Sequence, residues 1–225
     1  MTKMSGHLIM ASTCLGLPDD IPERTAKYAK EADLVVFEER RPARQVLKKA
    51  GVHREFLCYN EQHQQSTLNE VRASLLSNKT VMYCSDQGCP TLEDPGRPLL
   101  KLAYSVNAKI SVIPGPSSLT AALSACPFET KQFQFLGFLP RETKQRLKAL
   151  RKVAANNSMQ IIMDTPYRLQ ALLESCNQTL GDRSLMLALD ISGKQEQFLI
   201  ASAKILINKT AQYKKLNFVL VVAPQ

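Results

Sequence analysis

Two short turns of small and rigid residues, each directly after a strand-like stretch, most constrain the fold of this 225-residue chain. Residues 79–84 (KTVMYC) and 109–113 (KISVI) are apolar and rich in β-branched side chains, which predicts buried strands. The turns that follow them are residues 85–96 (SDQGCPTLEDPG) and 114–118 (PGPSS). The intervening residues 97–107 space their apolar side chains as a helix does. This pattern predicts a strand–loop–helix–strand unit with parallel strands.

The composition of both turns suits the binding of a small molecule. Ligands of parallel sheets bind beyond the carboxyl ends of the strands, which is where both turns lie. Gly88 allows a ligand to approach the backbone, and prolines such as Pro90 hold the loops in fixed shapes. Ser117 and Ser118 open the next predicted helix, whose free N–H groups favour a carboxylate or phosphate. For either turn taken alone, the alternative is an ordinary turn and an ordinary helix cap.

The rest of the chain alternates strands and helices without internal repeats. Further strands are predicted at residues 8–12, 34–37, 133–138, 159–163, 184–189, 197–201 and 217–222. Helices are predicted at residues 23–33, 43–50, 67–76, 117–126, 142–155 and 167–180, with Thr67 and Glu70 as a possible capping box. This alternation of strands and helices is interrupted near residues 114–118. We therefore expect two α/β domains, residues 1–115 and 116–225, with a cleft between them.

The chain is basic, which bears on its partners. It carries 29 Lys and Arg against 20 Asp and Glu, a formal net charge of +9. Such a charge favours a polyanion such as nucleic acid, although anionic tetrapyrroles or membrane surfaces would fit the same sign.

The cysteines, histidines and apolar runs limit the remaining classes. The six cysteines form no CxxC pair and the three histidines lie far apart, so we expect reduced cysteines and no metal site. The longest apolar runs are too short to span a bilayer and no signal peptide is evident. The chain is therefore expected to be cytoplasmic and not membrane-bound.

Seven segments follow one another along nearly the whole chain: KEADLVVFEERRPAR, SDQGCPTLEDPG, IPGPSSLTAALSA, FLGFLPRE, MDTPYR, GDR and FVLVV. In this order and spacing they resemble the tetrapyrrole (corrin/porphyrin) methylase superfamily, and within it the branch named ribosomal RNA small-subunit methyltransferase I. The resemblance implies S-adenosylmethionine as methyl donor, two α/β domains with the cofactor between them, and a homodimer. That branch methylates a ribose 2′-hydroxyl of a cytidine in small-subunit ribosomal RNA.

The resemblance also implies a cofactor site, made of residues at the ends of strands in both halves of the chain. Its first part matches the loop after residues 79–84 and the PGPSS turn, and its second part follows two strands of the second domain. The implied residues are Ser12, Ser85, Asp86, Gln87, Gly88, Cys89, Pro90, Leu92, Glu93, Ser117, Ser118, Met163, Asp164, Ala188 and Leu189.

Substrate-binding and catalytic residues are implied in the same way. Arginines that match basic positions of the family, and that could grip phosphates, are Arg41, Arg44, Arg141 and Arg168. A ribose hydroxyl is a weak acid, so its methylation needs a base or a polarising cation beside it. Glu38 and Asp86 are the candidates by position. The alternative for the first domain is a structural ion pair between Glu38 or Glu39 and Arg41 or Arg44.

A basic run in the second domain could also meet RNA. One predicted helix carries six cations and a single acid, Glu142; the cations are Arg141, Lys144, Arg146, Lys148, Arg151 and Lys152. Such a run is either a solvated helix face or a surface that contacts RNA phosphates.

Three functions remain open on the sequence. The first is an RNA ribose methylase, and the second is a methylase of a tetrapyrrole or another small molecule. The third is a non-catalytic relative that keeps the cofactor pocket or the basic face. Departures from the family pattern, such as STCLGLPDD in the first loop and LDISGK after residue 188, leave the third open.

Overall fold

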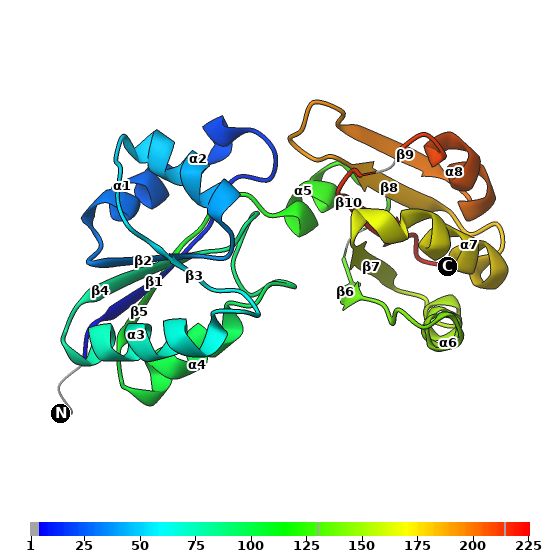
Figure 1. Ribbon diagram of the computed structural model, residues 1–225. Helices are drawn as coiled ribbons and strands as arrows, with labels where there is room; N and C mark the ends of the chain where they lie inside the picture. Colours follow the sequence, from blue (N-terminus) through cyan, green and yellow to red (C-terminus); the bar gives the residue numbers. More distant parts are fainter. Residues whose placement is uncertain (1–4, 130, 214) are drawn as a thin grey trace. The chain divides into compact units, whose positions relative to one another are not determined.

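The computed structural model describes residues 5–129, 131–213 and 215–225 and has two compact units, which are drawn in Figure 1. Unit 1 is Met1–Ser117 and unit 2 is Ser118–Gln225. Each unit contains a five-stranded sheet with helices against it, so the predicted α/β class is confirmed. The roles expected for residues 1–115 and 116–225 in holding substrate and cofactor stay a prediction.

Unit 1 is built on a wholly parallel sheet. Its strands are β1 (His7–Ala11), β2 (Leu34–Phe37), β3 (Leu57–Cys58), β4 (Thr80–Cys84) and β5 (Lys109–Ile113). They lie in the order β3-β2-β4-β1-β5, and every neighbouring pair is parallel. All carboxyl ends therefore meet at one edge of the sheet.

The helices of unit 1 divide between the two faces of this sheet. They are η1 (Pro18–Asp20), α1 (Glu23–Glu31), α2 (Arg40–Ala50), α3 (Gln64–Leu76) and α4 (Arg97–Ser105). α1 and α2 pack on one face, and α3 and α4 pack on the other (Figure 1). Neighbouring strands in the order β3-β2-β4-β1 therefore send their following helices to opposite faces. Where two connections diverge in this way, a crevice opens beyond the carboxyl ends of the strands.

Unit 2 has a mixed sheet. Its strands are β6 (Phe133–Phe138), β7 (Met159–Asp164), β8 (Leu185–Leu189), β9 (Gln197–Ala201) and β10 (Phe218–Val222), in the order β6-β7-β10-β8-β9. β6 and β7 are parallel, and the other neighbouring pairs are antiparallel.

The two faces of this second sheet are covered unequally. The helices are α5 (Ser118–Ser124), α6 (Thr143–Ala154), η2 (Pro166–Arg168), α7 (Leu169–Leu180) and α8 (Ala203–Thr210). α6, α7 and α8 pack against one face, whereas the other face is packed by α5 and the chain that follows it. Within residues 5–129, 131–213 and 215–225, no helix is both long and apolar enough to cross a bilayer.

Several predicted boundaries are wrong, and each has a local cause. α2 begins at Arg40, because Pro42 falls in the first turn, where it removes no helical hydrogen bond. α3 begins at Gln64, and the Thr67 hydroxyl donates to the Cys58 carbonyl (2.8 Å), so the predicted capping box is wrong. The residues before α7 form a 3₁₀ turn that starts at Pro166. β3 and α8 were not predicted, because both are short and lack a clear period.

Candidate functional site

Three loops of unit 1 meet beyond the neighbouring strands β4, β1 and β5. The Thr13 N–H donates to the Gly88 carbonyl (2.9 Å), and the Gly88 N–H donates to the Cys14 carbonyl (3.2 Å). The Gln87 side-chain amide donates to the Leu15 carbonyl (2.8 Å). The loop after β4 is therefore fixed to the loop after β1 mainly by backbone hydrogen bonds.

The turn after β5 lies against the same loop. The Cys89 thiol donates to the Pro116 carbonyl (3.4 Å) and accepts from the buried Ser12 hydroxyl (3.3 Å). A Cβ placed on Gly88 would lie 3.2 Å from the Pro116 carbonyl oxygen and 3.9 Å from the Cα of Ser117. The two turns that the sequence singles out are thus side by side.

The loop after β4 has unusual backbone angles. Gly88 has a φ of +68°, which a residue with a side chain adopts only with strain. Thr91 and Glu93 also have positive φ angles, of 74° and 60°. A β-branched residue such as threonine is rarely found there, and such strain clusters at ligand-binding segments. The conformation of this loop therefore points to binding rather than to a simple change of direction.

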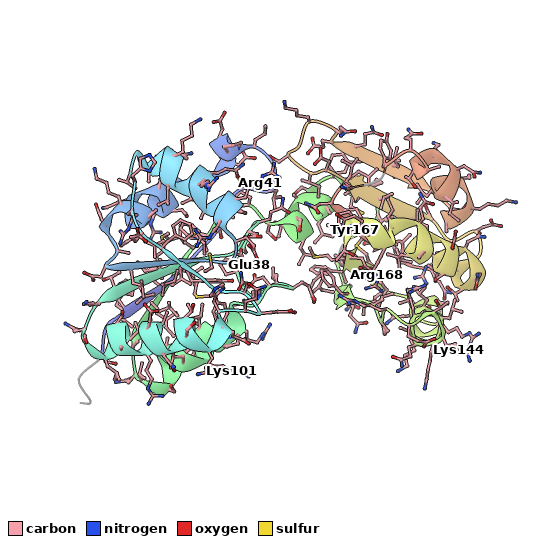
Figure 2. All side chains as sticks on the ribbon, in the orientation of Figure 1. Glu38, Arg41, Lys101, Lys144, Tyr167 and Arg168 are labelled. Atoms are coloured by element: carbon pink, nitrogen blue, oxygen red, sulfur yellow. The ribbon has the colours of Figure 1, made fainter. Side chains whose placement is uncertain are left out.

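Two carboxylates follow the neighbouring strands β2 and β4 and face each other. The Asp86 N–H donates to Oε2 of Glu38 (3.2 Å), and the Glu39 N–H donates to Oδ1 of Asp86 (3.0 Å). Each carboxylate is therefore positioned by a backbone donor on the opposite strand end. Figure 2 shows Glu38 at the edge of the sheet, at the base of α2.

The environment of this carboxylate pair favours the protonated form. Burial, and then the negative charge of Asp86, raise the pKa of Glu38 to about 7. Burial raises the pKa of Asp86 to about 6, against the opposing effect of its hydrogen bond from Glu39. A carboxylate with a pKa near neutrality is well matched to accept a proton at physiological pH.

The structural ion pair considered for this region is not present. In the described part of the chain, neither Glu38 nor Glu39 forms a salt bridge with Arg41 or Arg44. The Glu39 carboxylate accepts a hydrogen bond from the Asn60 side chain (3.2 Å). Arg41 and Arg44 are both exposed.

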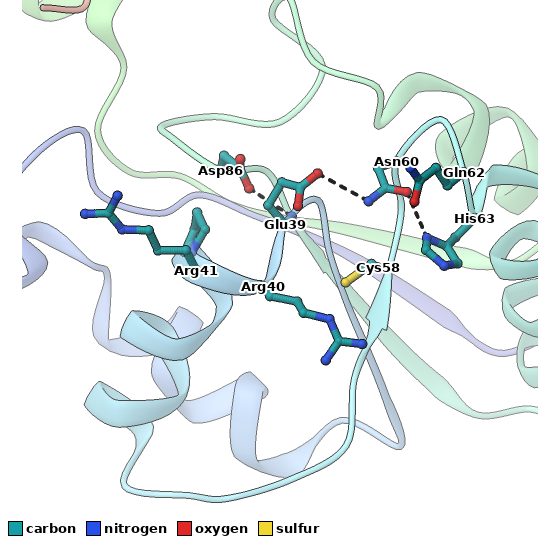
Figure 3. A pocket seen from close by; sticks show the side chains of 9 residues that line it. Glu39, Arg40, Arg41, Cys58, Asn60, Gln62, His63 and Asp86 are labelled. Carbon is teal, nitrogen blue, oxygen red and sulfur yellow. Dashed lines mark hydrogen bonds between the residues drawn. The ribbon is translucent and has the colours of Figure 1, made fainter. Parts of the chain in front are cut away.

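A pocket of about 600 Å³ opens beside this pair, between the start of α2 and the loop after β3 (Figure 3). Its lining includes Arg40, Arg41, Cys58, Asn60, Gln62 and His63. Apart from Arg41, sequence reasoning missed these residues, because β3 is only two residues long. The polar run NEQH after LC was the signal that could have found them.

The predicted cofactor residues of unit 2 lie on the strands of its central sheet. Met163 and Ala188 both pair with Val219 of β10, so they flank it on the face packed by α5. Leu189 is fully buried on the opposite face. Asp190 and Ser192, in the turn after β8, have positive φ angles of 47° and 62°. The structure therefore brings Met163 and Ala188 together but directs Leu189 away from them.

Asp164 and Arg168 hold each other at the end of β7. Nη1 of Arg168 lies 3.1 Å from Oδ1 of Asp164. Nη2 of Arg168 donates to the carbonyls of Leu139 (2.8 Å) and Pro140 (2.9 Å). Oδ2 of Asp164 is buried and has no hydrogen-bond partner in the described part of the chain. The guanidinium of Arg168 therefore has an evident structural use, and its contact with substrate stays a prediction.

The remaining predicted positions divide by exposure. Ser12 and Ser85 are buried, whereas Leu92 and Glu93 are exposed. Ser118 is the first residue of α5. Of the arginines, exposed ones are Arg41, Arg44 and Arg141.

Not all of the basic side chains on α6 are exposed. Glu142 caps the helix by accepting hydrogen bonds from the next turn. Arg146 is buried: its Nε donates to the Ser175 hydroxyl (2.9 Å) and its Nη1 to the Arg141 carbonyl (2.9 Å). Arg146 is thus a structural residue. The exposed cations of the helix are Lys144, Lys148, Arg151 and Lys152.

Comparison with known proteins assigns this arrangement to a family. A sequence profile of the tetrapyrrole (corrin/porphyrin) methylases matches residues 7–206. The chain belongs to this family. The predicted resemblance is thereby confirmed, and so is the prediction of a methyltransferase, which uses S-adenosylmethionine as the family does.

Several relatives match this family member over most of their length. The ribosomal RNA small subunit methyltransferase I of Thermotoga maritima is 30% identical over 217 residues, or 96% of this chain and 97% of that protein. The protein of the same name from Synechocystis is 28% identical over 220 residues, or 97% and 79%.

Solved structures show the same fold. Cobalt precorrin-4 methyltransferase, a cobalamin biosynthetic enzyme, matches with a TM-score of 0.72 and 16% identity, over 96% of this chain and 94% of that one. Uroporphyrin-III-C-methyltransferase from Thermus thermophilus matches with a TM-score of 0.65 and 16% identity, over 97% and 94%. At these identities the likeness concerns the fold alone.

Proposed function

We propose that this methyltransferase transfers the methyl group of S-adenosylmethionine to a ribose 2′-hydroxyl, that of a cytidine, in small-subunit ribosomal RNA. The proposal rests on the 30% identity, over 96% of the chain, to a relative named ribosomal RNA small subunit methyltransferase I. The formal net charge of +9 supports a polyanionic acceptor.

The residues present in unit 1 fit the methyl donor. The donor carries an amino-acid end, which needs polar partners, and an adenosine, which needs an apolar surface. Gly88 lies in a cradle that a Cβ would crowd, because the Leu15 Cδ2 would be 3.1 Å away. Backbone groups of this loop, together with the hydroxyl of Ser117, would hold the donor in unit 1. The roles expected for Met163 and Ala188 of unit 2 toward the donor stay a prediction.

Catalysis would rest on alignment and on removal of one proton. When bound, S-adenosylmethionine supplies an already activated methyl group, so the chain's main tasks are positioning and proton transfer. Glu38 would take the proton of the 2′-hydroxyl at its Oε1 or Oε2, because its pKa of about 7 is matched to neutral pH. Asp86 would hold Glu38 in place through its backbone N–H.

Basic side chains in both units would bind the RNA. Arg41 and Arg44 lie on α2, and Arg141 lies just before α6. Guanidinium groups bind phosphates in a planar, bidentate way. Arg41 is labelled in Figure 2, where it projects from the start of α2.

The apolar face of unit 2 supports a homodimer. Phe133, Phe198 and Ile200 are 45%, 38% and 47% exposed. By register they point to the sheet face that α5 packs, since they pair with Met159, Ala188 and Met186 of that face. They lie on the two edge strands of the sheet, β6 and β9, where a second copy of the chain could cover them. Light scattering that shows a dimer would agree with this assignment. The cytoplasm remains the expected compartment of the protein.

Methyl incorporation tests the proposed acceptor. The protein is incubated with radiolabelled S-adenosylmethionine and, separately, with small ribosomal subunits, naked small-subunit RNA and uroporphyrinogen. Label in either RNA sample is expected. Label only in uroporphyrinogen would favour a tetrapyrrole methylase, and donor binding without label in any acceptor would favour a non-catalytic relative.

A further inference from the structure

We propose that the pocket between α2 and the loop after β3 binds one nucleotide of a single-stranded RNA, adjacent to the nucleotide that receives the methyl group. This inference deepens the proposed function and rests on it for the identity of the RNA. It concerns residues that neither the sequence motifs nor the carboxylate pair require.

The pocket occupies a position where parallel sheets bind ligands. β3 and β2 are neighbours, and α2 packs on one face of the sheet whereas α3 packs on the other. The connections after β2 and β3 therefore diverge, and a crevice opens beyond their carboxyl ends. Arg40 and Cys58 line this crevice from its two sides. The pocket is thus produced by the topology of the sheet and not by a chance gap between side chains.

Arg40 brings a guanidinium to a pocket whose lining also holds the carboxylates of Glu39 and Asp86. Arg40 and Arg41 stand in the first turn of α2, a turn that contains no acidic residue. Cations are unfavourable at a helix N-terminus, because the helix dipole is positive there. In the described part of the chain, no salt bridge compensates either arginine. A phosphate in the pocket would relieve this repulsion.

The two arginines point in different directions. Figure 3 shows the side chain of Arg40 extending toward Cys58, whereas that of Arg41 extends away from it. The charge of Arg40 acts on the Cys58 thiol, whose pKa it lowers against the larger, raising effect of burial. The guanidinium of Arg40 is therefore available to a ligand in the pocket, whereas that of Arg41 is available to another part of the RNA. A guanidinium can bind a phosphate or stack on an unpaired base.

The opposite wall offers hydrogen-bonding groups suited to a base. Oδ1 of Asn60 lies 2.9 Å from Nδ1 of His63, and Nδ2 of Asn60 donates to Glu39 (3.2 Å). Asn60 is therefore held in place (Figure 3). Gln62 is exposed, and its amide can both donate and accept. Unpaired RNA bases are read by such groups on their hydrogen-bonding edges.

Size and position complete the argument. A pocket of about 600 Å³ accommodates a nucleotide, since small-molecule sites span roughly 300–1,000 Å³. Asp86 lines the pocket and also donates its N–H to Glu38. A nucleotide in the pocket would therefore lie beside the proposed base, and its neighbour in the strand would present its ribose to Glu38.

Binding of a short fluorescent single-stranded RNA, followed by anisotropy, tests this proposal without requiring catalysis. Arg40→Ala is expected to weaken binding by about tenfold, the loss of one charge-assisted contact. It should also reduce the slope of log K against log salt by about 0.7, the value for one phosphate of a single strand. Gln62→Ala should weaken binding by a few fold without changing that slope. Both side chains are exposed, so the fold is expected to survive, which a thermal melt checks.

Lys101→Ala is the matched control. Lys101 is an exposed cation on α4 of the same unit (Figure 2), so its loss changes the net charge by the same amount. Its RNA affinity should equal that of the unmodified protein. Equal affinities of the Arg40→Ala and Lys101→Ala variants would overturn the proposal.

Competition separates a nucleotide site from a simple anion site. Cytidine, adenosine, guanosine and uridine 5′-monophosphates are each added to the RNA complex, and inorganic phosphate is added at the same concentration. At least one nucleotide should displace the RNA better than phosphate does. Equal competition by phosphate would reduce the pocket to an anion site and overturn the proposal.

Methyl transfer distinguishes failure of this inference from failure of the proposed function. If the unmodified protein methylates the RNA, Arg40→Ala should raise KM by about tenfold and change kcat less. Unchanged KM would overturn the pocket while the RNA methylase stands. RNA binding that depends on Arg40, with no methyl transfer to any RNA, would support the pocket and refute the proposed function.

Discussion

Two regions of the carboxyl edge of the unit 1 sheet are built in opposite ways. Beyond β1, β4 and β5, the loops are fixed to one another by backbone hydrogen bonds around Gly88. Beyond β2 and β3, the pocket is lined by side chains, several of them exposed and charged. A backbone-defined site suits a ligand that never varies, such as the methyl donor. A side-chain-defined site suits recognition of a particular RNA, because side chains carry the hydrogen-bonding code.

The Glu38–Asp86 pair stands between these regions. Asp86 follows β4, which lies between β1 and β2 in the sheet, so the pair joins the backbone-defined side to the pocket. The comparison therefore predicts that substitutions at the pair affect turnover, those at the donor loops affect donor binding, and those at charged surfaces affect RNA affinity.

The largest effect is expected at the pair itself. Glu38→Gln keeps the shape and an acceptor for the Asp86 N–H but removes the base, so kcat should fall by about 10²- to 10⁴-fold. Donor binding, measured by calorimetry, should be unchanged. In the unmodified protein, kcat/KM should fall as pH drops below about 7, because protonated Glu38 cannot accept a proton.

Glu61→Gln is the control for this substitution. Glu61 is an exposed acid of the same unit, just before α3. Its kcat and its pH profile should match those of the unmodified protein. A Glu38→Gln variant with the same kcat as Glu61→Gln would remove Glu38 from the reaction.

The second-largest effect is expected at the donor loops, where a substitution should weaken donor binding. Gly88→Val should weaken binding of S-adenosylmethionine by roughly 100-fold, about 3 kcal/mol from a strained φ and an overpacked contact. The new Cβ would lie 3.1 Å from Leu15 Cδ2 and 3.2 Å from the Pro116 carbonyl oxygen, so the loop must move. Calorimetry measures the affinity.

Gly51→Val provides a matched comparison. Gly51 has a φ of +66°, close to that of Gly88, but no atom lies within 4 Å of its Cβ position. It ends α2, so the variant should lose stability and still bind the donor. If both variants bind the donor equally well, Gly88 does not belong to the donor site.

A smaller effect is expected on unit 2. Replacing Lys144 and Lys148 together by alanine should weaken RNA binding by several fold and make it less dependent on salt. The double replacement of Lys204 and Lys209, exposed on α8, removes the same charge from another helix. If both double variants lose affinity equally, the α6 surface contributes only net charge.

The smallest effect concerns stability. The pKa of Glu38 is raised from 4.5 to about 7, so between these pH values the folded chain binds more protons than the unfolded chain. Stability therefore falls as pH rises through this window. Glu38→Gln should raise Tm by a few degrees at pH above 7 and by less near the lower limit. An equal gain at both pH values would show that the carboxylate is not the cause.

The sequence was sufficient for the α/β class and for the family, because strand periods and ordered motifs are local signals. The arrangement around Gly88 also follows from them, since the loops after β4 and β5 both flank β1. The position of Arg146 did not follow. A cation in a basic helix reads as exposed, and only the contact with Ser175 of α7 shows that it is buried.

The pocket was missed for a related reason. β3 has two residues, too few to show a period, so the residues after it read as loop. Its pairing with β2 is a long-range contact, and it alone places Asn60 opposite Arg40. The pKa of Glu38 likewise depends on burial, which residue spacing does not reveal.

The most direct test of the central claim is the position of the transferred methyl group. Small ribosomal subunits are methylated with labelled S-adenosylmethionine, and the RNA is digested to nucleosides and separated by mass spectrometry. We expect the label on the ribose of cytidine, as 2′-O-methylcytidine, and a strong reduction of that label with the Glu38→Gln variant. Label on a base, or none in RNA from a protein that binds the donor, would contradict the account.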